Sequence, residues 1–556
     1  MAYDHRKYSP FPLIDRPQRR WPSRAITEAP AWCAVDLRDG NQALVRPMSV
    51  EQKRRLFQLL VSIGVKEIEV GFPSASQPDF DFVRAIIEEG LIPQDVTIQV
   101  LVQAREELIA RTFEALKGVH RAVVHLYNST STVQRDYVFE LPRDGIREIA
   151  VHGAQLIKEH AAKRPETEWW FEYSPESFTG TELDFAAEIC NAVIDVWRPD
   201  QGQHVIINLP STVEMSMPNV YADMIEWMHD NIKYRDKIRL SVHTHNDRGC
   251  GVAAAELGML AGADRVEGTL LGNGERTGNT DMVTMAMNLY SQGVDPKLDL
   301  SDMRRIIEVV EYCTEIKTHP RHPWAGELVY TAFSGSHQDA IRKSLAKQTT
   351  QEPWHVAYLP IDPADLGRRY EEVVRINSQS GKGGVLYVLE RDFGITLPRW
   401  LQIAFSKVVQ QQAERTGNEI DGAEVRELFD QAYVNAPEDL RLGDYQVNRV
   451  GDSVRVEASV SNMPVRGEGN GVVDAFMNGI RSSHGVTGVV EAFDEFALTS
   501  GTTAPAMACV RLGIEGQAVV GVAFAADTTG AALQAVLNAL GRVRAVSRGA
   551  GGIAAE

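Results

Sequence analysis

The sequence has 556 residues, well beyond the roughly 250–300 residues at which one hydrophobic core stops growing. We therefore expect two or three domains. Apolar residues make up 44% and charged residues 24% of the chain, a balance that excludes a wholly disordered protein. The 75 acidic and 57 basic residues give a net charge of −18, which argues against nucleic acid and membrane surfaces as partners.

The five cysteines are an odd number, lie far apart and show no CxxC spacing. They predict buried thiols in a reducing compartment rather than disulfides or a zinc cluster. The N-terminal segment lacks the apolar core of a signal peptide, and no uninterrupted apolar stretch approaches the ~18 residues of a membrane helix. These features predict a cytoplasmic protein.

The first 326 residues predict an arm followed by a barrel. Residues 1–30 are rich in proline, arginine and aromatic residues and indicate an extended N-terminal arm on a surface. Over residues 31–326, eight apolar or β-branched runs alternate with amphipathic helical stretches. Eight such units fit a (β/α)8 TIM barrel better than a doubly wound open sheet. The runs are Cys33–Asp36, Glu67–Phe72, Thr97–Val102, Ala122–Tyr127, Trp169–Tyr173, Val205–Leu209, Arg239–His243 and Arg265–Leu270.

The remaining chain predicts two further parts and a tail. Residues 327–435 mix turns with helices and indicate a helical linker subdomain. Residues 440–546 are rich in strands, in the order strand–strand–helix and then strand–strand–strand–helix. This order predicts a small α+β domain with weak internal duplication. Residues 547–556 are rich in glycine and alanine and are expected to form a flexible tail.

Polar residues gather where the predicted strands end, which in a barrel is the face that carries active sites. Strand one runs into DLRDGNQ, strand seven into HTHND and strand eight into GNGERTGN. Strands four, five and six contribute His125, the segment from Ser174 to Glu176, and Thr212. Such groups would be costly in a core unless they were paired or bound to something. Their concentration at one end predicts the functional site.

Two histidines are central to this predicted site. His243 and His245 alternate along strand seven, so both imidazoles should point into the barrel mouth. Asp39 is expected to lie close to strand seven, across the mouth of the barrel. Two histidines and one carboxylate are a typical ligand set for a divalent metal that keeps coordination positions open for substrate. Asn279 could add a carbonyl oxygen, directly or through water. The alternative is a pair of hydrogen-bonded histidines without a metal, which the added aspartate disfavours.

The neighbouring polar residues have two interpretations each. Arg38 could stabilise a developing enolate or alkoxide oxygen, or form a structural ion pair with Glu176 or Glu275. Both glutamates could serve as acid–base groups or as anchors for other site residues. Thr212 could bind a substrate carboxylate or cap a helix.

Several motifs together resemble a known family. DLRDGNQ, SPE, NLPSTVE, HTHNDRG and GNGERTGN, in this order and spacing, resemble the α-isopropylmalate synthases. FSGSHQDAI and YLPIDPADLGRRYE resemble the longer bacterial form, and GEGNGVVDAF resembles its C-terminal leucine-sensing domain. The resemblance covers all but the first ~30 and last ~10 residues. It departs at Val472, where the family usually has proline, and this leaves the affinity for leucine open.

The resemblance implies a Claisen-type condensation of acetyl-CoA with 3-methyl-2-oxobutanoate (2-oxoisovalerate), followed by thioester hydrolysis. This reaction is the first committed step of leucine biosynthesis, with leucine as the feedback inhibitor. The resemblance also implies a homodimer, whose active site could be shared between chains because in relatives the subdomain after the barrel reaches over the barrel of the other chain. It further implies a divalent metal on Asp39, His243, His245 and Asn279. Mg is most expected, Mn, Zn or Co are alternatives, and a monovalent cation could act as an activator.

The resemblance also assigns residues to roles. It points to His337, working with Glu275, as the base that removes a methyl proton of the thioester, and it places Tyr370 near the site. The catalytic set is Arg38, Glu176, Glu275, His337 and Tyr370, and the set that binds the 2-oxo acid is Arg38, His125, Ser174 and Thr212. Leucine is expected at two strand-to-helix turns, where simple capping is the alternative, marked by Gly467, Gly469, Ala525 and Asp527.

Other functions stay open at this point. Homocitrate and citramalate synthases differ only in the side chain of the 2-oxo acid. A non-haem iron oxygenase also uses two histidines and a carboxylate, but it would leave Arg38 and Glu176 without roles. A leucine-binding sensor without catalysis is disfavoured because the set of candidate catalytic residues is complete.

Overall fold

The computed structural model describes residues 11–12, 14–332, 334–349, 352–368, 382–416, 420–435, 440–498 and 504–547. The chain divides into two compact units. The first comprises residues 1–329 with 361–368, and the second comprises residues 330–360 with 369–556. Residues 361–368, which fall within the expected linker, therefore belong to the first unit.

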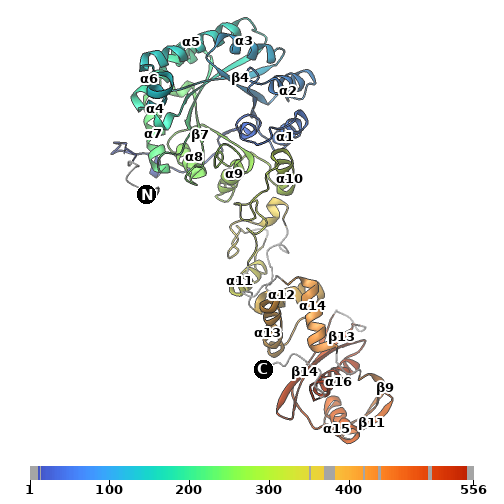
Figure 1. The fold of residues 1–556 in the computed structure, drawn as a ribbon. Coiled ribbons are helices and arrows are strands. Elements are labelled where there is room, and N and C mark those ends of the chain that lie inside the picture. Colours follow the sequence, from blue (N-terminus) through green and yellow to red (C-terminus); the bar gives the residue numbers. More distant parts are fainter. Residues whose placement is uncertain are drawn as a thin grey trace, which may run out of the picture. The chain divides into compact units, whose positions relative to one another are not determined.

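The first unit contains a closed barrel of eight parallel strands, each paired with the next and the last with the first (Figure 1). The prediction of a TIM barrel is confirmed. The first strand ends at Ala34, two residues earlier than expected, and a π-helical turn, η3 (Asp36–Gly40), follows it. The strands are β1 (Ala31–Ala34), β2 (Glu67–Gly71), β3 (Thr97–Gln103), β4 (Arg121–Ser129), β5 (Glu168–Glu176), β6 (His204–Ser211), β7 (Arg239–Thr244) and β8 (Arg265–Gly268).

Helices surround the strands (Figure 1). In the first of them, Leu56, Phe57 and Leu60 are buried, and a capping box between Ser49 and Gln52 determines where the helix begins. The helices of this unit are α1 (Val50–Ser62), α2 (Gln77–Glu88), α3 (Glu106–Ala115), α4 (Thr132–Gln134), α5 (Arg143–Ala162), α6 (Leu183–Trp197), α7 (Pro218–Asn231), α8 (Gly251–Leu260), α9 (Met282–Tyr290) and α10 (Met303–Thr314).

The interior of the barrel carries a network of charged side chains. Arg265 on β8 is fully buried, and its guanidinium donates to Glu67 on β2 at 2.6 Å and to Gln99 on β3 at 2.7 Å. The same group donates to Glu267 at 2.9 Å. Buried charges persist only when they are paired and hydrogen-bonded in this way. The interior of the barrel is therefore a connected layer of hydrogen-bonded polar side chains.

The N-terminal segment lies on helix α7. Arg19 Nε and the Trp21 indole donate to Asp223 at 2.7 and 2.9 Å, and Arg16 Nε donates to Glu226 at 3.2 Å. Asp223 and Glu226 are buried beneath it. These contacts attach the described part of the arm to the barrel wall.

The second unit combines helices with two β–β–β–α repeats. The helices are α11 (Gly335–Leu345), α12 (Lys382–Phe393), α13 (Arg399–Thr416) and α14 (Gly422–Phe429). The repeats are β9 (Leu442–Val450), β10 (Ser453–Val460), β11 (Met463–Gly469) and α15 (Val472–His484), then β12 (Val489–Ala497), β13 (Ala506–Ile514), β14 (Gln517–Ala525) and α16 (Thr528–Ser547). The expected α+β domain is confirmed, with one strand more than expected.

The additional strand is β11, whose sequence does not resemble that of a typical strand. It contains Pro464, Gly467 and Gly469, residues that are unfavourable in a strand interior. β11 lies at the edge of its sheet, where proline is tolerated because one side of the strand needs no partner. The duplication is therefore closer than the sequence pattern indicates.

Alternate residues of β13 join two cores. Ala508 and Val510 pack with α15 and α16, whereas Met507 and Cys509 pack with the helices α12 to α14. All five cysteines are free, and four of them are buried, while Cys250 is partly exposed. Within the part of the chain that the structure describes, no helix has both the length and the apolar character needed to span a membrane.

Candidate active site

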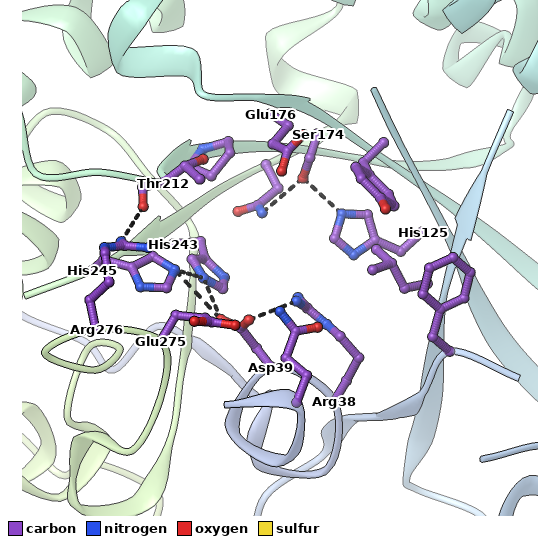
Figure 2. Close-up of a pocket in the computed structure, with 16 residues that line it drawn as sticks. Arg38, Asp39, His125, Ser174, Glu176, Thr212, His243, His245, Glu275 and Arg276 are labelled. Atoms are coloured by element: carbon purple, nitrogen blue, oxygen red, sulfur yellow. Dashed lines mark hydrogen bonds and ion pairs between the residues drawn. The ribbon is translucent and has the colours of Figure 1, made fainter. Parts of the chain in front are cut away.

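Asp39, His243 and His245 meet at the carboxyl end of the barrel (Figure 2). Asp39 Oδ2 lies 3.3 Å from His243 Nε2 and 3.6 Å from His245 Nε2, and the two imidazole nitrogens are 3.3 Å apart. β1 and β7 both pair with β8, so Asp39 approaches the histidines from a strand two places along rather than across the mouth. The predicted cluster is thus formed by near neighbours.

The residues of this cluster fit a divalent cation. All three are buried, and each can offer one ligand atom within 4.8 Å of the others. Asp39 Oδ2 and Asn279 Oδ1 are buried without a hydrogen-bond partner. Unsatisfied buried oxygens are rare in folded proteins, and coordination to a cation would satisfy such an oxygen. Asn279 is held beside His245 by a backbone bridge.

Burial and neighbouring charges shift the pKa of each of these three residues. Burial alone would raise the pKa of Asp39, but the Arg38 guanidinium and His243 hold it well below its usual range. Burial and the neighbouring His243 lower the pKa of His245 to about 4, which keeps that ring neutral. Burial would lower the pKa of His243, but the carboxylates of Asp39 and Glu267 raise it to about 9, so a metal that bound Nε2 would displace a proton from it. Its Nδ1 lies 2.8 Å from Glu267, which orients the ring with Nε2 toward Asp39.

Arg38 has a different partner from the two proposed from sequence. Its Nε donates to Glu69 Oε2 at 2.5 Å, and its Nη1 lies 3.1 Å from Asp39 Oδ1. The expected alternatives, Glu176 and Glu275, line the same pocket but do not form this pair. Glu69 and Asp39 overcome the effect of burial and raise the pKa of Arg38, so it is a permanent cation beside the candidate metal site.

A pocket of about 300 Å³ opens at the cluster. On one wall, His125 Nε2 lies 2.7 Å from Ser174 Oγ, and Asn208 Nδ2 donates to the same oxygen at 3.0 Å. His125 Nδ1 is 2.9 Å from Glu69 Oε1, so the same carboxylate orients His125 and Arg38. An apolar part of the wall comes from Phe72, Leu101, Tyr127 and Pro210.

Comparison with known proteins identifies the family. The chain matches the HMGL-like family over residues 29–310, the alpha-isopropylmalate synthase post-catalytic domain-like family over residues 327–390, and the LeuA allosteric (dimerisation) domain over residues 419–544. It is 59% identical over 552 residues to a 2-isopropylmalate synthase of Alcanivorax borkumensis, covering 98% of this chain and 99% of that protein. The chain belongs to the 2-isopropylmalate synthase family.

Two further matches have lower sequence identity. A 2-isopropylmalate synthase of Pseudomonas savastanoi pv. phaseolicola is 53% identical over 542 residues, covering 97% of each chain. A solved hydroxymethylglutaryl-CoA lyase of Pseudomonas aeruginosa is 17% identical, with a TM-score of 0.44 over 53% of this chain and 97% of that one. The family resemblance predicted from the motifs is confirmed.

Three more predicted residues line the pocket: Glu176, Thr212 and Glu275. Thr212 Oγ1 accepts from the Ser177 backbone N–H at 2.9 Å, which leaves its own hydroxyl proton available to a ligand. It does not cap α7, which begins after Met217, so the capping alternative is wrong. Glu176 accepts a hydrogen bond from Ser129 Oγ. Its carboxylate is thereby held at the end of β5.

Two predicted catalytic residues, His337 and Tyr370, come after the barrel in the sequence. His337 lies on α11 in the second unit, where it is exposed and its ring stacks on Tyr358 with centroids 3.9 Å apart. Tyr370 lies outside the described residues. Their roles in the reaction stay predictions.

The four residues predicted to bind the leucine ligand make contacts within the C-terminal domain itself. A Cβ on Gly467 would lie 2.1 Å from the Ala475 carbonyl oxygen, so glycine is needed where β11 packs on α15. A Cβ on Gly469 would lie 2.5 Å from Asp474 Oδ2. Asp527 accepts from Gly530 N at 2.8 Å at the start of α16 and from the Tyr445 hydroxyl, while Ala525 ends β14. These contacts favour the packing and capping interpretation, and leucine binding stays a prediction.

Several functional residues were missed from sequence because they lie within strands instead of after them. Glu69 connects Arg38 to His125, Asn208 holds Ser174, and Glu267 orients His243. A signal was present: charged and amide residues occupy alternate positions of otherwise apolar strands, as in the Glu67–Gly71 segment EIEVG. Alternate residues share one face, so this pattern indicates a polar barrel interior.

Proposed function

We propose that the chain condenses acetyl-CoA with 3-methyl-2-oxobutanoate and hydrolyses the resulting thioester to 2-isopropylmalate and CoA. The observation that carries this proposal is the set Asp39, His243 and His245 beside Arg38 in one pocket. Its chemistry suits a 2-oxo acid, whose adjacent carbonyl and carboxylate oxygens can chelate a cation. The synthase relatives that match nearly the whole chain support the same reaction.

The cation would be held by Asp39, His243 and His245, with Asn279 as a further oxygen ligand. We propose Mg²⁺ first, with Mn²⁺, Zn²⁺ or Co²⁺ as alternatives, since oxygen and imidazole ligands accept all four. When bound, the metal supplies Lewis-acid polarisation of the 2-oxo carbonyl. Arg38 then stabilises the negative charge that develops on this oxygen during addition.

The remaining pocket residues bind and orient the substrate. The Thr212 hydroxyl donates to the carboxylate of the 2-oxo acid, and His125 and Ser174 on the neighbouring strands β4 and β5 help to hold the substrate. Glu275 lies at the pocket and, with His337, is the proposed base that removes a proton from the acetyl methyl group. The new carbon–carbon bond joins that carbon to C2 of the 2-oxo acid, and Tyr370 and Glu176 are proposed to assist in proton transfer. Water then hydrolyses the thioester and releases CoA.

The apolar wall predicts the preferred 2-oxo acid. Phe72, Leu101, Tyr127 and Pro210 suit an isopropyl group, and none of them carries a positive charge to pair with a second carboxylate. We expect kcat/KM for 3-methyl-2-oxobutanoate to exceed that for pyruvate by roughly 10²–10⁴-fold, because pyruvate lacks two methyl groups and each costs about 10–200-fold. We expect 2-oxoglutarate to be poorer still, because its distal charge would be buried unpaired. Thiol release from acetyl-CoA measures all three.

A preference for pyruvate in this assay would assign the chain to citramalate synthesis, and a preference for 2-oxoglutarate would assign it to homocitrate synthesis. Oxygen uptake without thiol release would instead favour the iron oxygenase. The assay thus separates the proposed function from each alternative.

We also propose that L-leucine binds the C-terminal domain and inhibits the reaction in a homodimer. The match to an allosteric dimerisation domain over residues 419–544 supports this proposal. We expect L-leucine to lower turnover of the full chain, and D-leucine, which has the same charge and composition, to have no effect. Initial rates with each enantiomer and sedimentation of the chain with and without L-leucine measure both parts. Equal inhibition by the two enantiomers would contradict a specific leucine site.

A further inference from the structure

A buried ion pair lies behind the candidate active site, between helices α1 and α2. Lys53 on α1 is 1% exposed and Asp79 in the first turn of α2 is 8% exposed. The Lys53 ammonium forms an ion pair with Asp79 Oδ1. Neither residue is among those that line the pocket.

Each partner also binds a backbone group that belongs to the site. Lys53 Nζ donates to the carbonyl oxygen of Leu37 at 3.3 Å. Leu37 lies in the η3 turn, directly before Arg38 and Asp39. Asp79 Oδ2 accepts from the backbone N–H of Phe72 at 2.8 Å, and Phe72 follows β2 and lines the pocket. The pair therefore connects the turn after β1 to the turn after β2.

The local sequence is adapted to this connection. Gly71 has a φ of +154°, and a Cβ there would lie 2.9 Å from Asp79 Oδ2, so the carboxylate occupies space that any other residue would need. Replacing a buried ion pair with apolar residues of similar volume is often neutral or stabilising. Stability alone therefore does not account for a lysine and an aspartate at these positions.

The rest of the η3 turn is anchored from the other side. Leu270 N donates to Asp36 Oδ1 at 3.0 Å, and Asn273 Nδ2 donates to the Gly40 carbonyl at 2.9 Å, both from the segment after β8. Lys53 supplies a hydrogen bond from the α1 side to the middle of the turn. Without it, the backbone that carries Arg38 and Asp39 would lose one of its anchors.

We propose that Lys53 and Asp79 are positioning residues, which hold the η3 turn so that Asp39 reaches the metal and Arg38 reaches the substrate oxygen. This inference rests on the proposed function, because it assigns the pair a role in that reaction. It predicts that the pair affects metal affinity and turnover more than it affects folding.

Two variants of the full chain test the proposal. Asp79→Asn keeps the side-chain shape but removes the charge, and the double variant Lys53→Met/Asp79→Leu replaces the pair with apolar side chains that the core can pack. We expect each to bind Mn²⁺ ~10–100-fold more weakly, as for other residues that orient metal ligands. Electron paramagnetic resonance of free Mn²⁺, titrated without substrates, measures this affinity. We expect kcat to fall by a similar factor and the KM for acetyl-CoA to stay unchanged.

Ile86→Ala is the matched control, because Ile86 is buried on the same helix α2 but has no part in the ion pair. It should lower the melting temperature and leave Mn²⁺ affinity and kcat unchanged. If the two pair variants behave like Ile86→Ala, the pair is structural and the proposal is wrong. If the wild-type chain binds no Mn²⁺, the metal set of the proposed function is wrong and the positioning role fails with it. Normal Mn²⁺ binding with unaffected pair variants overturns the positioning role alone.

Discussion

Asp39→Asn should abolish metal binding and turnover while leaving the fold intact. Asp39 is the only carboxylate of the three-residue set, and its Oδ2 lies 3.3 and 3.6 Å from the two histidines. The neutral amide removes the charge that attracts the cation and leaves the Arg38 guanidinium beside the metal site with Glu69 as its remaining ion-pair partner. We expect Mn²⁺ affinity to fall by more than ~100-fold, beyond the effect of changing an outer-sphere partner. Turnover should fall by ~10³-fold or more, because the 2-oxo carbonyl is no longer polarised.

Direct Mn²⁺ titration and thiol release from acetyl-CoA measure the two effects separately. Asp95→Asn is the matched control: it makes the same chemical change in an exposed carboxylate that pairs with Lys66. It should bind Mn²⁺ and turn over like the wild-type chain. Unchanged Mn²⁺ affinity in Asp39→Asn would show that the metal binds elsewhere, and the proposed mechanism would then lose its basis.

The parts of the site that follow strand ends were predictable from sequence. Asp39, His243 and His245 stand where alternation and barrel topology bring side chains to one rim. The sequence placed Asp39 across the mouth from strand seven, whereas β1 and β7 both flank β8, so the cluster was predicted correctly but its approach was not. No knowledge of individual rotamers was needed to predict the cluster.

The partners of these residues were not predictable in the same way. Sequence reasoning paired Arg38 with Glu176 or Glu275, since these acidic residues also follow strands. The structure pairs it with Glu69, one strand away inside the barrel, because β1 and β2 are adjacent. Which of several buried carboxylates an arginine reaches depends on register and rotamer, and neither is encoded in a local pattern.

The extent of the C-terminal repeats illustrates a second limit. β11 was missed because Pro464 and two glycines counted against a strand, although its edge position tolerates the proline. Its glycines are needed for close packing on α15, because a Cβ added to Gly467 would lie 2.1 Å from the Ala475 carbonyl oxygen. A long-range contact therefore overrode the local preference, which a single sequence does not display.

Arg38→Lys should bind metal normally and lose most of its turnover. Lysine keeps a positive charge opposite the buried Glu69, whereas alanine would break this buried ion pair at a cost of about 3–5 kcal/mol. The lysine ammonium cannot reproduce the planar fork with which Arg38 contacts Glu69 at 2.5 Å and Asp39 at 3.1 Å. The donor facing the reacting oxygen is therefore displaced, and we expect kcat to fall by ~10²–10³-fold, as when one oxyanion donor is removed.

Arg38→Lys should differ from a variant of a metal ligand, because it should lose turnover and keep its affinity for Mn²⁺. Mn²⁺ affinity and the KM for 3-methyl-2-oxobutanoate should stay close to wild type, because the charge near Asp39 is retained and the interaction acts in the transition state. Arg147→Lys, in a pair with Glu188 on the barrel exterior, provides the matched control and should have full activity. If Arg38→Lys had wild-type kcat, a positive charge alone would suffice at this position, and the geometry of the guanidinium would have no part in catalysis.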